Sequence, residues 1–417
     1  MYDRKLQSRT DQIPRRLWTA GVRTRGSFVL AGILALPAQC STEPPGSQSA
    51  ASSAEQRHPI PGAMLSSSAD APVRDVYFTD PDPTVASWLS ELDVFPESSA
   101  IGSSELPNAL VLGKIVDGVV IPAKPGHTIT IALLDASYGM VRVFTLDGAP
   151  HTAFGGLGAG PGEVTSPVAL EHRDGMLVVL DAAMKIERYE LIGRQWQHAD
   201  RVPLPVDAQS VCITDDGFAV LGLRSGELSE PGQPVGRRTV HLISERDQET
   251  TESFAEPYRH ESELAVWSMA RGKLVCDPGR RLLWVAYSAL RELHAYDFGG
   301  NLRWIARLKD MNSPDFIETG GTRIRRDLGS SATADVISHI SLLDDMVLAV
   351  QVASYSTTRT PSEPRQVDFR TYFVDANTGT GLGGIRAKHQ VIGGGQSRAI
   401  LYRDDPFPQV AVVALRR

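Results

Sequence analysis

The feature that most limits the fold of this chain is a strand–break–strand unit that recurs along it. Residues 129–148, 176–193 and 282–300 align on this unit: an apolar strand comes first, then a second strand with an aromatic residue near its end, then a Gly turn. Alternating side chains, such as Val141 and Val143, turn one face of the second strand inward. Each stretch is therefore predicted to form a β-hairpin.

Short turn sequences show how often the unit repeats. They are Pro125–Gly126, Asp174–Gly175, Asp216–Gly217, Pro278–Gly279, Asp344–Asp345 and Asp404–Asp405. An apolar strand follows each turn, and long amphipathic helical patterns are missing. We therefore predict an all-β chain that forms a six-bladed β-propeller with four-stranded antiparallel blades, in which each blade is covered by its neighbours. A β-sandwich is the alternative, but hairpins that repeat six times fit it poorly.

Both ends of the chain are expected to contribute strands to the last blade. The sixth unit has strands near residues 397–403 and 409–415, and the sequence then stops at Arg417. N-terminal strands are expected to complete this last blade, from residues 73–78 and from the stretch between Trp88 and Leu112. Residues 82–92 could instead form a short helix, with Asp82 as its N-cap and Pro83 in its first turn.

The first 39 residues have the pattern of a signal peptide. They carry a net charge of +5 and include an apolar stretch, residues 28–37, that is too short to span a bilayer. The segment resembles a bacterial lipoprotein signal, which predicts lipidation of Cys40, although Pro37 and Gln39 depart from the usual residues before the cysteine. An ordinary cleaved signal and an uncleaved anchor are the alternatives, and a start near Val22 would make the signal more compact.

The remaining chain divides into a tether and a folded body. Residues 40–71 are rich in Ser, Ala, Pro and Gly and predict a flexible tether, whereas residues 72–417 predict the propeller. The total charge is −7, so the chain without its first 39 residues carries −12, which disfavours nucleic acid and anionic lipid as partners. Cys212 and Cys276 lie in apolar runs and are expected to be buried free thiols rather than a disulfide.

A Gly-rich run, FGGLGAGPGEVTSPVAL at residues 154–170, superficially suggests a phosphate-binding loop. Its spacing does not match a dinucleotide fingerprint or a P-loop, and no helix is expected after it. Because the run connects an outer strand to the first strand of the next unit, it predicts a crossover between blades, where glycine permits positive φ. Pro161 and Pro167 stiffen this bend, and the Glu163 carboxylate is expected to accept hydrogen bonds from its own turn.

This crossover carries a resemblance to a known family. The motif residues are Gly158, Gly160, Pro161, Gly162, Glu163 and Pro167. With Phe154 and Gly155 they resemble the signature of six-bladed propellers related to NHL repeats, which are common among exported and lipid-anchored bacterial proteins. Val164 stands where that signature has an aromatic residue, which predicts a thinner core contact. The resemblance implies a propeller and export, in the periplasm or at the cell surface.

Propellers of this kind include binding modules and a few enzymes that hold a metal at one mouth of the channel. The polar residues expected along the inner strands are Asp117, Glu171, His172, His339, Gln396 and Arg398. Asp117, His172 and His339 could converge on Ca²⁺ or Zn²⁺, but polar side chains also line wet channels without chemistry, and no hydrolase motif is present. The favoured function is a monomeric, lipid-anchored extracytoplasmic module that binds a protein, peptide or glycan, without catalytic residue, metal or cofactor. The alternative is a metal-dependent hydrolase or lyase.

Overall fold

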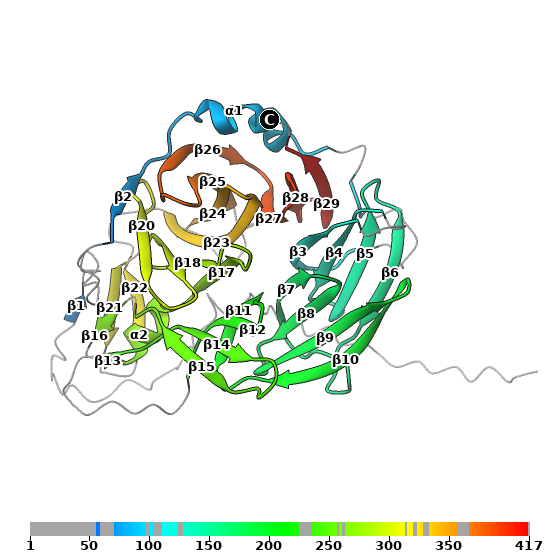
Figure 1. Cartoon of the computed structure of the whole chain (residues 1–417). Helices are drawn as coiled ribbons and strands as arrows, with labels where there is room; N and C mark the ends of the chain where they lie inside the picture. Colours follow the sequence, from blue (N-terminus) through cyan, green and yellow to red (C-terminus); the bar gives the residue numbers. More distant parts are fainter. Residues whose placement is uncertain are drawn as a thin grey trace, which may run out of the picture. The chain divides into compact units, whose positions relative to one another are not determined.

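A computed structural model of the 417-residue chain shows a ring of antiparallel sheets (Figure 1). It describes residues 56–58, 71–96, 100–102, 111–123, 128–224, 235–256, 258–260, 263–312, 315–319, 323–327, 333–356 and 367–415. Within these residues six sheets follow one another around a common centre, with the first strand of each sheet innermost. The predicted six-bladed propeller is confirmed.

The first three blades each contain four strands. Blade 1 contains β3 (Ile115–Ile121), β4 (Thr130–Asp135), β5 (Met140–Thr145) and β6 (Pro150–Gly155); blade 2 contains β7 (Pro167–Arg173), β8 (Met176–Asp181), β9 (Lys185–Ile192) and β10 (Gln195–Pro203); blade 3 contains β11 (Asp207–Ile213), β12 (Gly217–Leu223), β14 (Val240–Ser244) and β15 (Thr250–Phe254). The hairpins predicted at residues 129–148 and 176–193 are β4–β5 and β8–β9.

The last three blades continue the same order. Blade 4 contains β17 (Gly272–Asp277), β18 (Leu282–Tyr287), β19 (Glu292–Asp297) and β20 (Leu302–Leu308); blade 5 contains β23 (Thr333–Asp344), β24 (Val347–Ser356), β25 (Val367–Asp375) and β26 (Gly381–Ala387); blade 6 contains β27 (Gln390–Gly394), β28 (Arg398–Arg403) and β29 (Gln409–Ala414). The predicted hairpin at residues 282–300 is β18–β19. In the other blades the predicted turn precedes the second strand, but the turn Asp404–Asp405 joins the second strand of blade 6, β28, to the third, β29. The predicted turn Pro125–Gly126 lies outside the described residues.

The hydrophobic core consists of one cluster between each pair of neighbouring blades. Leu134 and Val141 of blade 1, for example, pack with Leu177 and Tyr189 of blade 2. Equivalent clusters join blades 2 and 3, 3 and 4, 4 and 5, 5 and 6, and finally 6 and 1. Both faces of every blade are therefore buried only because the ring is closed.

The N-terminal side of the chain completes the ring, but not with every residue that was expected. Ile101 pairs with Val410 of β29 through two backbone hydrogen bonds of 2.7 and 2.9 Å, at the fourth position of blade 6. The expectation that residues 73–78 join this blade is wrong, because β2 (Val73–Val76) pairs in parallel with β20 at the edge of blade 4. The chain therefore reaches blade 6 only after passing blade 5.

Helix α1 (Pro83–Asp93) spans the gap between these two contacts and lies outside blades 5 and 6 (Figure 1). The Asp82 carbonyl accepts hydrogen bonds from the N–H groups of Val85 and Ala86, both at 2.9 Å, so the helix begins where the N-cap was predicted. Trp88 is fully buried and meets the Phe373 ring edge-on. Val85, Trp88 and Leu92 are spaced three and four residues apart and join the core between blades 5 and 6, which explains why these residues form a helix rather than a strand.

Several short elements lie outside the ring. They are β1 (Gln56–His58), β13 (Val235–Gly236), β16 (Arg259–His260), α2 (Glu263–Met269), β21 (Asp315–Thr319) and β22 (Arg323–Asp327). Strand β1, within the segment expected to be a tether, pairs with β21, which in turn pairs with β22. Among the described residues, no helix is long and apolar enough to cross a membrane.

Candidate functional site

The inner strands share a local irregularity that sets which side chains meet at the channel. In β3, β7, β11, β23 and β27 the pairing with the second strand shifts by one residue, as in a β-bulge. The residues that follow the first shift in each strand are Asp117, Ala169, Ser210, His339 and Gly393. Strand β17 pairs with β18 in unbroken register from Gly272 to Asp277.

Two of these residues join neighbouring blades. The Asp117 carboxylate accepts hydrogen bonds from the N–H of Leu170 in blade 2, at 2.9 Å, and from the N–H of Gly118, at 2.8 Å. The Ser210 hydroxyl accepts a hydrogen bond from the N–H of Leu274 in blade 4, at 3.1 Å. Asp117 and Ser210 each accept this bond from the next blade that they contact, so the donors Leu170 and Leu274 hold corresponding positions, and so do the residues before them, Ala169 and Lys273. Ala169 follows a register shift as Asp117 does. Lys273 therefore lies at the same level of the channel as Asp117, which we call the channel layer.

Four ionisable groups lie in this layer or beside it: Asp117, Lys273, His339 and Glu171. For each of them, burial disfavours the charged form. Burial raises the pKa of the Asp117 carboxyl to about 6 and, with help from the Asp117 charge, raises the pKa of Glu171 to about 8. Burial and the nearby Lys273 charge lower the pKa of His339 to about 3, and burial also lowers the pKa of Lys273 itself. At neutral pH, Glu171 is therefore protonated, His339 is neutral, and Lys273 faces the opposite charge of Asp117.

The residues that were expected to line the channel are only partly brought together. Asp117 and His339 share the layer described above, whereas His172 lies at a pocket between blades 1 and 2. Arg398 begins β28, the second strand of blade 6, and donates a hydrogen bond of 3.0 Å to the carbonyl of Gln396 in the preceding turn. Within the described residues, no group of three or more His, Cys, Asp or Glu side chains could hold a metal ion. Lys273 was not among the predicted channel residues, although a single Lys in an apolar inner strand could have indicated that it lines the channel.

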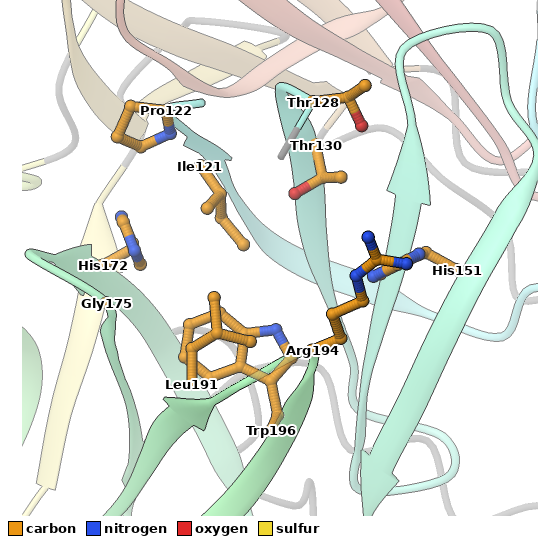
Figure 2. Close-up of a pocket in the computed structure, with 10 residues that line it drawn as sticks. All are labelled: Ile121, Pro122, Thr128, Thr130, His151, His172, Gly175, Leu191, Arg194 and Trp196. Atoms are coloured by element: carbon orange, nitrogen blue, oxygen red, sulfur yellow. The ribbon is translucent and has the colours of Figure 1, made fainter. Parts of the chain in front are cut away.

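A pocket of about 230 Å³ opens between blades 1 and 2 (Figure 2). Its lining consists of Ile121, Pro122, Thr128, Thr130, His151, His172, Gly175, Leu191, Arg194 and Trp196. The pocket lies at the end of β3, beside β6, and near the turns that join β7 to β8 and β9 to β10. In Figure 2, His151 and Arg194 lie on one side of the pocket and His172 lies on the other.

Trp196 forms the aromatic wall of this pocket and packs against two neighbouring rings. The Trp196 ring stacks on Phe154 of β6 with the ring centroids 5.9 Å apart, and the His172 ring meets Trp196 edge-on at 6.1 Å. Trp196 is 9% exposed, so most of its surface is used in packing and little of it can move. The pocket therefore has a rigid apolar wall, while Thr128, His151 and Arg194 at its opening are exposed.

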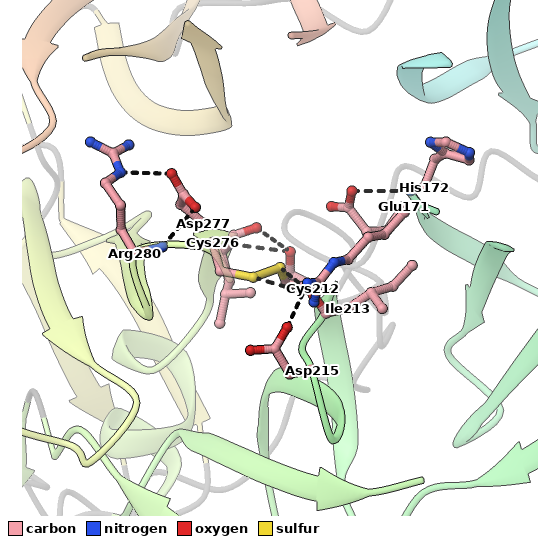
Figure 3. The surroundings of a disulfide bond; sticks show 11 residues. Glu171, His172, Cys212, Ile213, Asp215, Cys276, Asp277 and Arg280 are labelled. Atoms are coloured by element: carbon pink, nitrogen blue, oxygen red, sulfur yellow. Dashed lines mark hydrogen bonds and ion pairs between the residues drawn. A yellow bond between two sulfur atoms is a disulfide. The ribbon is translucent and has the colours of Figure 1, made fainter. Parts of the chain in front are cut away.

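A disulfide links the inner strands of blades 3 and 4 (Figure 3). It joins Cys212 of β11 to Cys276 of β17, whose Cα atoms are 6.1 Å apart. The expectation of two buried free thiols is therefore wrong. The cysteines are 64 residues apart in sequence, and only the ring places their strands side by side. Beyond the disulfide, Asp277 pairs with Arg280 at 2.6 Å.

The Gly-rich run extends from the end of β6 into β7, at the crossover from blade 1 to blade 2. The N–H of Gly160 donates a hydrogen bond of 2.8 Å to the Glu163 carboxylate, within the same turn. Blade 2 also holds the run: the Tyr189 hydroxyl donates to the Gly162 carbonyl at 2.6 Å, and Arg201 donates to the Gly160 carbonyl at 2.6 Å. Glycine is required at position 162, where φ is 72°.

Two residues flank the centre of this crossover. Pro167 begins β7, and Val164 is 1% exposed in the core between blades 1 and 2. Cys40, the predicted lipidation site, lies outside the described residues.

Comparisons with known proteins bear on the fold. A scan against protein-family models and a search of curated proteins found no match. Among solved structures, the chain is similar to a member of the DUF4221 family from Bacteroides vulgatus, with 11% identity, 76% of this chain and 95% of that chain covered, and a TM-score of 0.50. It is also similar to a protein from Bacteroides fragilis described as a candidate exported protein, with 11% identity, 83% and 100% covered, and a TM-score of 0.45. At 11% identity, the similarity to the DUF4221 structure supports the propeller fold alone.

Proposed function

We propose that this protein is a binding module that acts outside the cytoplasm, as a monomer held at a membrane by a lipid on Cys40. The pocket between blades 1 and 2 carries the proposal. It combines a rigid apolar wall with exposed polar groups at its opening, which is the composition of a small-molecule binding site. A protein, peptide or glycan group that enters this pocket would be held by the turns on one face of the propeller.

Three observations support the location. Disulfides persist in oxidising compartments, and the Cys212–Cys276 bond joins two blades. The first 39 residues have the pattern of a signal peptide. The crossover from Gly158 to Pro167 also supports a relation to NHL-like propellers, many of which are exported.

The lipid anchor is tested by fractionation of cells that express the full chain. We expect wild-type protein to partition with membranes and to incorporate a labelled fatty acid, and the Cys40→Ser variant to do neither. Ser41→Ala, next to the proposed attachment site, is the matched control and should behave as the wild type. Membrane partitioning of Cys40→Ser would overturn the anchor.

Binding at the pocket is tested with arrays of glycans and peptides. We expect the full chain to bind one class, and Thr128→Trp to abolish that binding because the larger side chain would fill the pocket opening. Thr251→Trp, an exposed substitution on β15 of blade 3, is the control and should leave binding unchanged. Binding that persists in Thr128→Trp would move the site elsewhere, and no binding by the wild-type chain would count against the proposal.

The alternative, a metal-dependent hydrolase or lyase in the channel, has less support. Asp117 would have to act as a ligand, but both of its carboxylate oxygens already accept hydrogen bonds from backbone N–H groups. Elemental analysis of the purified chain separates the two functions. Stoichiometric Ca²⁺ or Zn²⁺ that is lost in His339→Ala would favour the enzyme.

A further inference from the structure

We infer that the pocket between blades 1 and 2 binds an acidic sugar, with the sugar carboxylate at Arg194 and one face of the sugar ring against the apolar wall. The inference deepens the proposed function and rests on it. It is carried by the charge of the pocket lining, by the pairing of the arginines in blade 2, and by the size and chemistry of the pocket walls.

The residues that the structure describes in the pocket lining are positive or neutral, and none of them is acidic. Arg194 lies in the turn between β9 and β10, where its side chain is exposed, and it forms no ion pair with any residue that the structure describes. The other arginines of blade 2 behave differently. Arg188 pairs with Asp200 at 3.2 Å, and Arg201 pairs with Glu187 at 2.6 Å.

Among the described residues, Arg194 is therefore a guanidinium without a carboxylate partner, at the opening of a pocket whose described lining has no carboxylate. A guanidinium binds a carboxylate through two parallel N–H···O bonds, so this pairing is the one that its chemistry favours. His151, on the same side of the pocket in Figure 2, offers a further ring N–H toward an anion.

The volume of the pocket limits the ligand to a small group. At about 230 Å³ it is below the roughly 300–1,000 Å³ of pockets that enclose drug-sized ligands. A single sugar residue, at the end of a chain or as a branch, is of a suitable size. The exposed residues at the opening leave room for the rest of a glycan to continue into solvent.

The walls match a sugar ring better than a simple anion. Ile121, Leu191 and Trp196 offer apolar surface, which can pack against the C–H face of a ring. Thr128 and Thr130 offer hydroxyl groups that can pair with ring hydroxyls. Inorganic phosphate has no apolar face and would leave these walls in contact with water. A carboxylated sugar can pair its carboxylate with Arg194 and also cover the apolar walls.

The inference is tested by calorimetric titration of the full chain with D-glucuronate and D-galacturonate. The matched neutral ligands are D-glucose and D-galactose, which carry CH₂OH in place of the carboxylate. We expect one of the two uronates to bind at least tenfold more tightly than its neutral partner. Arg194→Ala should remove this preference and Arg194→Lys should restore part of it. Because Arg194 is exposed, neither variant should alter the thermal unfolding of the protein.

The control for Arg194 is Arg246→Ala. Arg246 is an exposed arginine in the turn between β14 and β15, which is the equivalent turn of blade 3, and its loss should leave uronate binding unchanged. Equal affinity for a uronate and its neutral sugar, equal loss in Arg194→Ala and Arg246→Ala, or phosphate binding as tight as that of the uronate would each overturn the inference. So would the absence of uronate binding.

The outcomes also separate this inference from the proposed function. If the chain binds a neutral glycan or a peptide in a manner that Thr128→Trp abolishes, the pocket remains a binding site and only the acidic sugar is wrong. If neither the arrays nor the uronates give binding that depends on the pocket, both proposals fail.

Discussion

The Asp117 carboxylate of blade 1 accepts a 2.9 Å hydrogen bond from the backbone N–H of Leu170 in blade 2. Asp117 is 9% exposed, and its other oxygen accepts from the N–H of Gly118. A side chain expected to line the channel therefore connects two inner strands. In this propeller, a channel position can contribute to the closure of the ring rather than to chemistry.

Loss of this connection should weaken the fold. Asp117→Ala leaves the Leu170 N–H without its partner, and we expect a loss of about 1–3 kcal/mol in the free energy of unfolding. Asp117→Asn keeps one carbonyl acceptor and should lose less. Urea denaturation measures both, with Asp345→Ala, an exposed substitution in the turn between β23 and β24, as the control. A loss for Asp117→Ala no larger than that of the control would contradict the assignment.

Glu171 should make stability depend on pH. Its carboxyl has a pKa of about 8 in the fold and about 4.3 in an unfolded chain. Between these values the folded state holds a proton that the unfolded state has lost, so the contribution of Glu171 to stability decreases as pH rises. Glu171→Gln cannot lose this proton and should exceed the wild type by about 1 kcal/mol or more at pH 9, with a much smaller difference near pH 4.5.

Urea denaturation of both proteins near pH 4.5, 7 and 9 measures this difference. Glu249→Gln, an exposed substitution in the turn between β14 and β15, serves as the control and should follow the wild type throughout. A difference between Glu171→Gln and the wild type that stays constant with pH would show that the pKa of Glu171 is the same in the folded and unfolded states.

The disulfide should stabilise the ring measurably. Reduction of Cys212–Cys276 releases two inner strands that it links across 64 residues, and we expect a loss of about 2–4 kcal/mol. Thermal unfolding with and without a reductant measures this loss. The double variant Cys212→Ala/Cys276→Ala should be less stable than the oxidised wild type and should not respond to the reductant. An equal response in both proteins would assign the effect to another cause.

Two neighbouring glycines in the crossover should differ sharply in their tolerance of alanine. A Cβ at position 158 would overlap the Glu163 carboxylate, whereas a Cβ at position 156 would have no atom within 4 Å. Because the Glu163 carboxylate would have to leave the Gly160 N–H, we expect Gly158→Ala to lose about 1 kcal/mol and Gly156→Ala to lose less. Chemical denaturation of the two variants is a matched comparison. Equal stability would mean that Glu163 moves aside at no cost.

The blades could be predicted from the sequence because a hairpin is a local structure. Alternation along strands such as β5 and the turns between them are set by residues only a few positions apart. The crossover could be placed for the same reason, since Glu163 bonds within its own turn. Contacts between distant segments were harder: β2 was assigned to blade 6 because nothing near Val73 indicates that its partner is Ile305.

The candidate site shows the same division. Arg194 and Trp196 carry no signal in the sequence, and no motif or spacing relates them to His151, or relates Lys273 to Asp117. The Lys273 charge acts on Asp117 because blades 1 and 4 face the same channel, and Arg194 shares a pocket with His151 because blades 1 and 2 are neighbours. The sequence by itself determined the repeated β-hairpins, the number of blades and the crossover, since these depend on local periodicity and turn chemistry. Only the tertiary structure decided the disulfide, the channel layer and the pocket, because each joins residues that closure of the ring brings together.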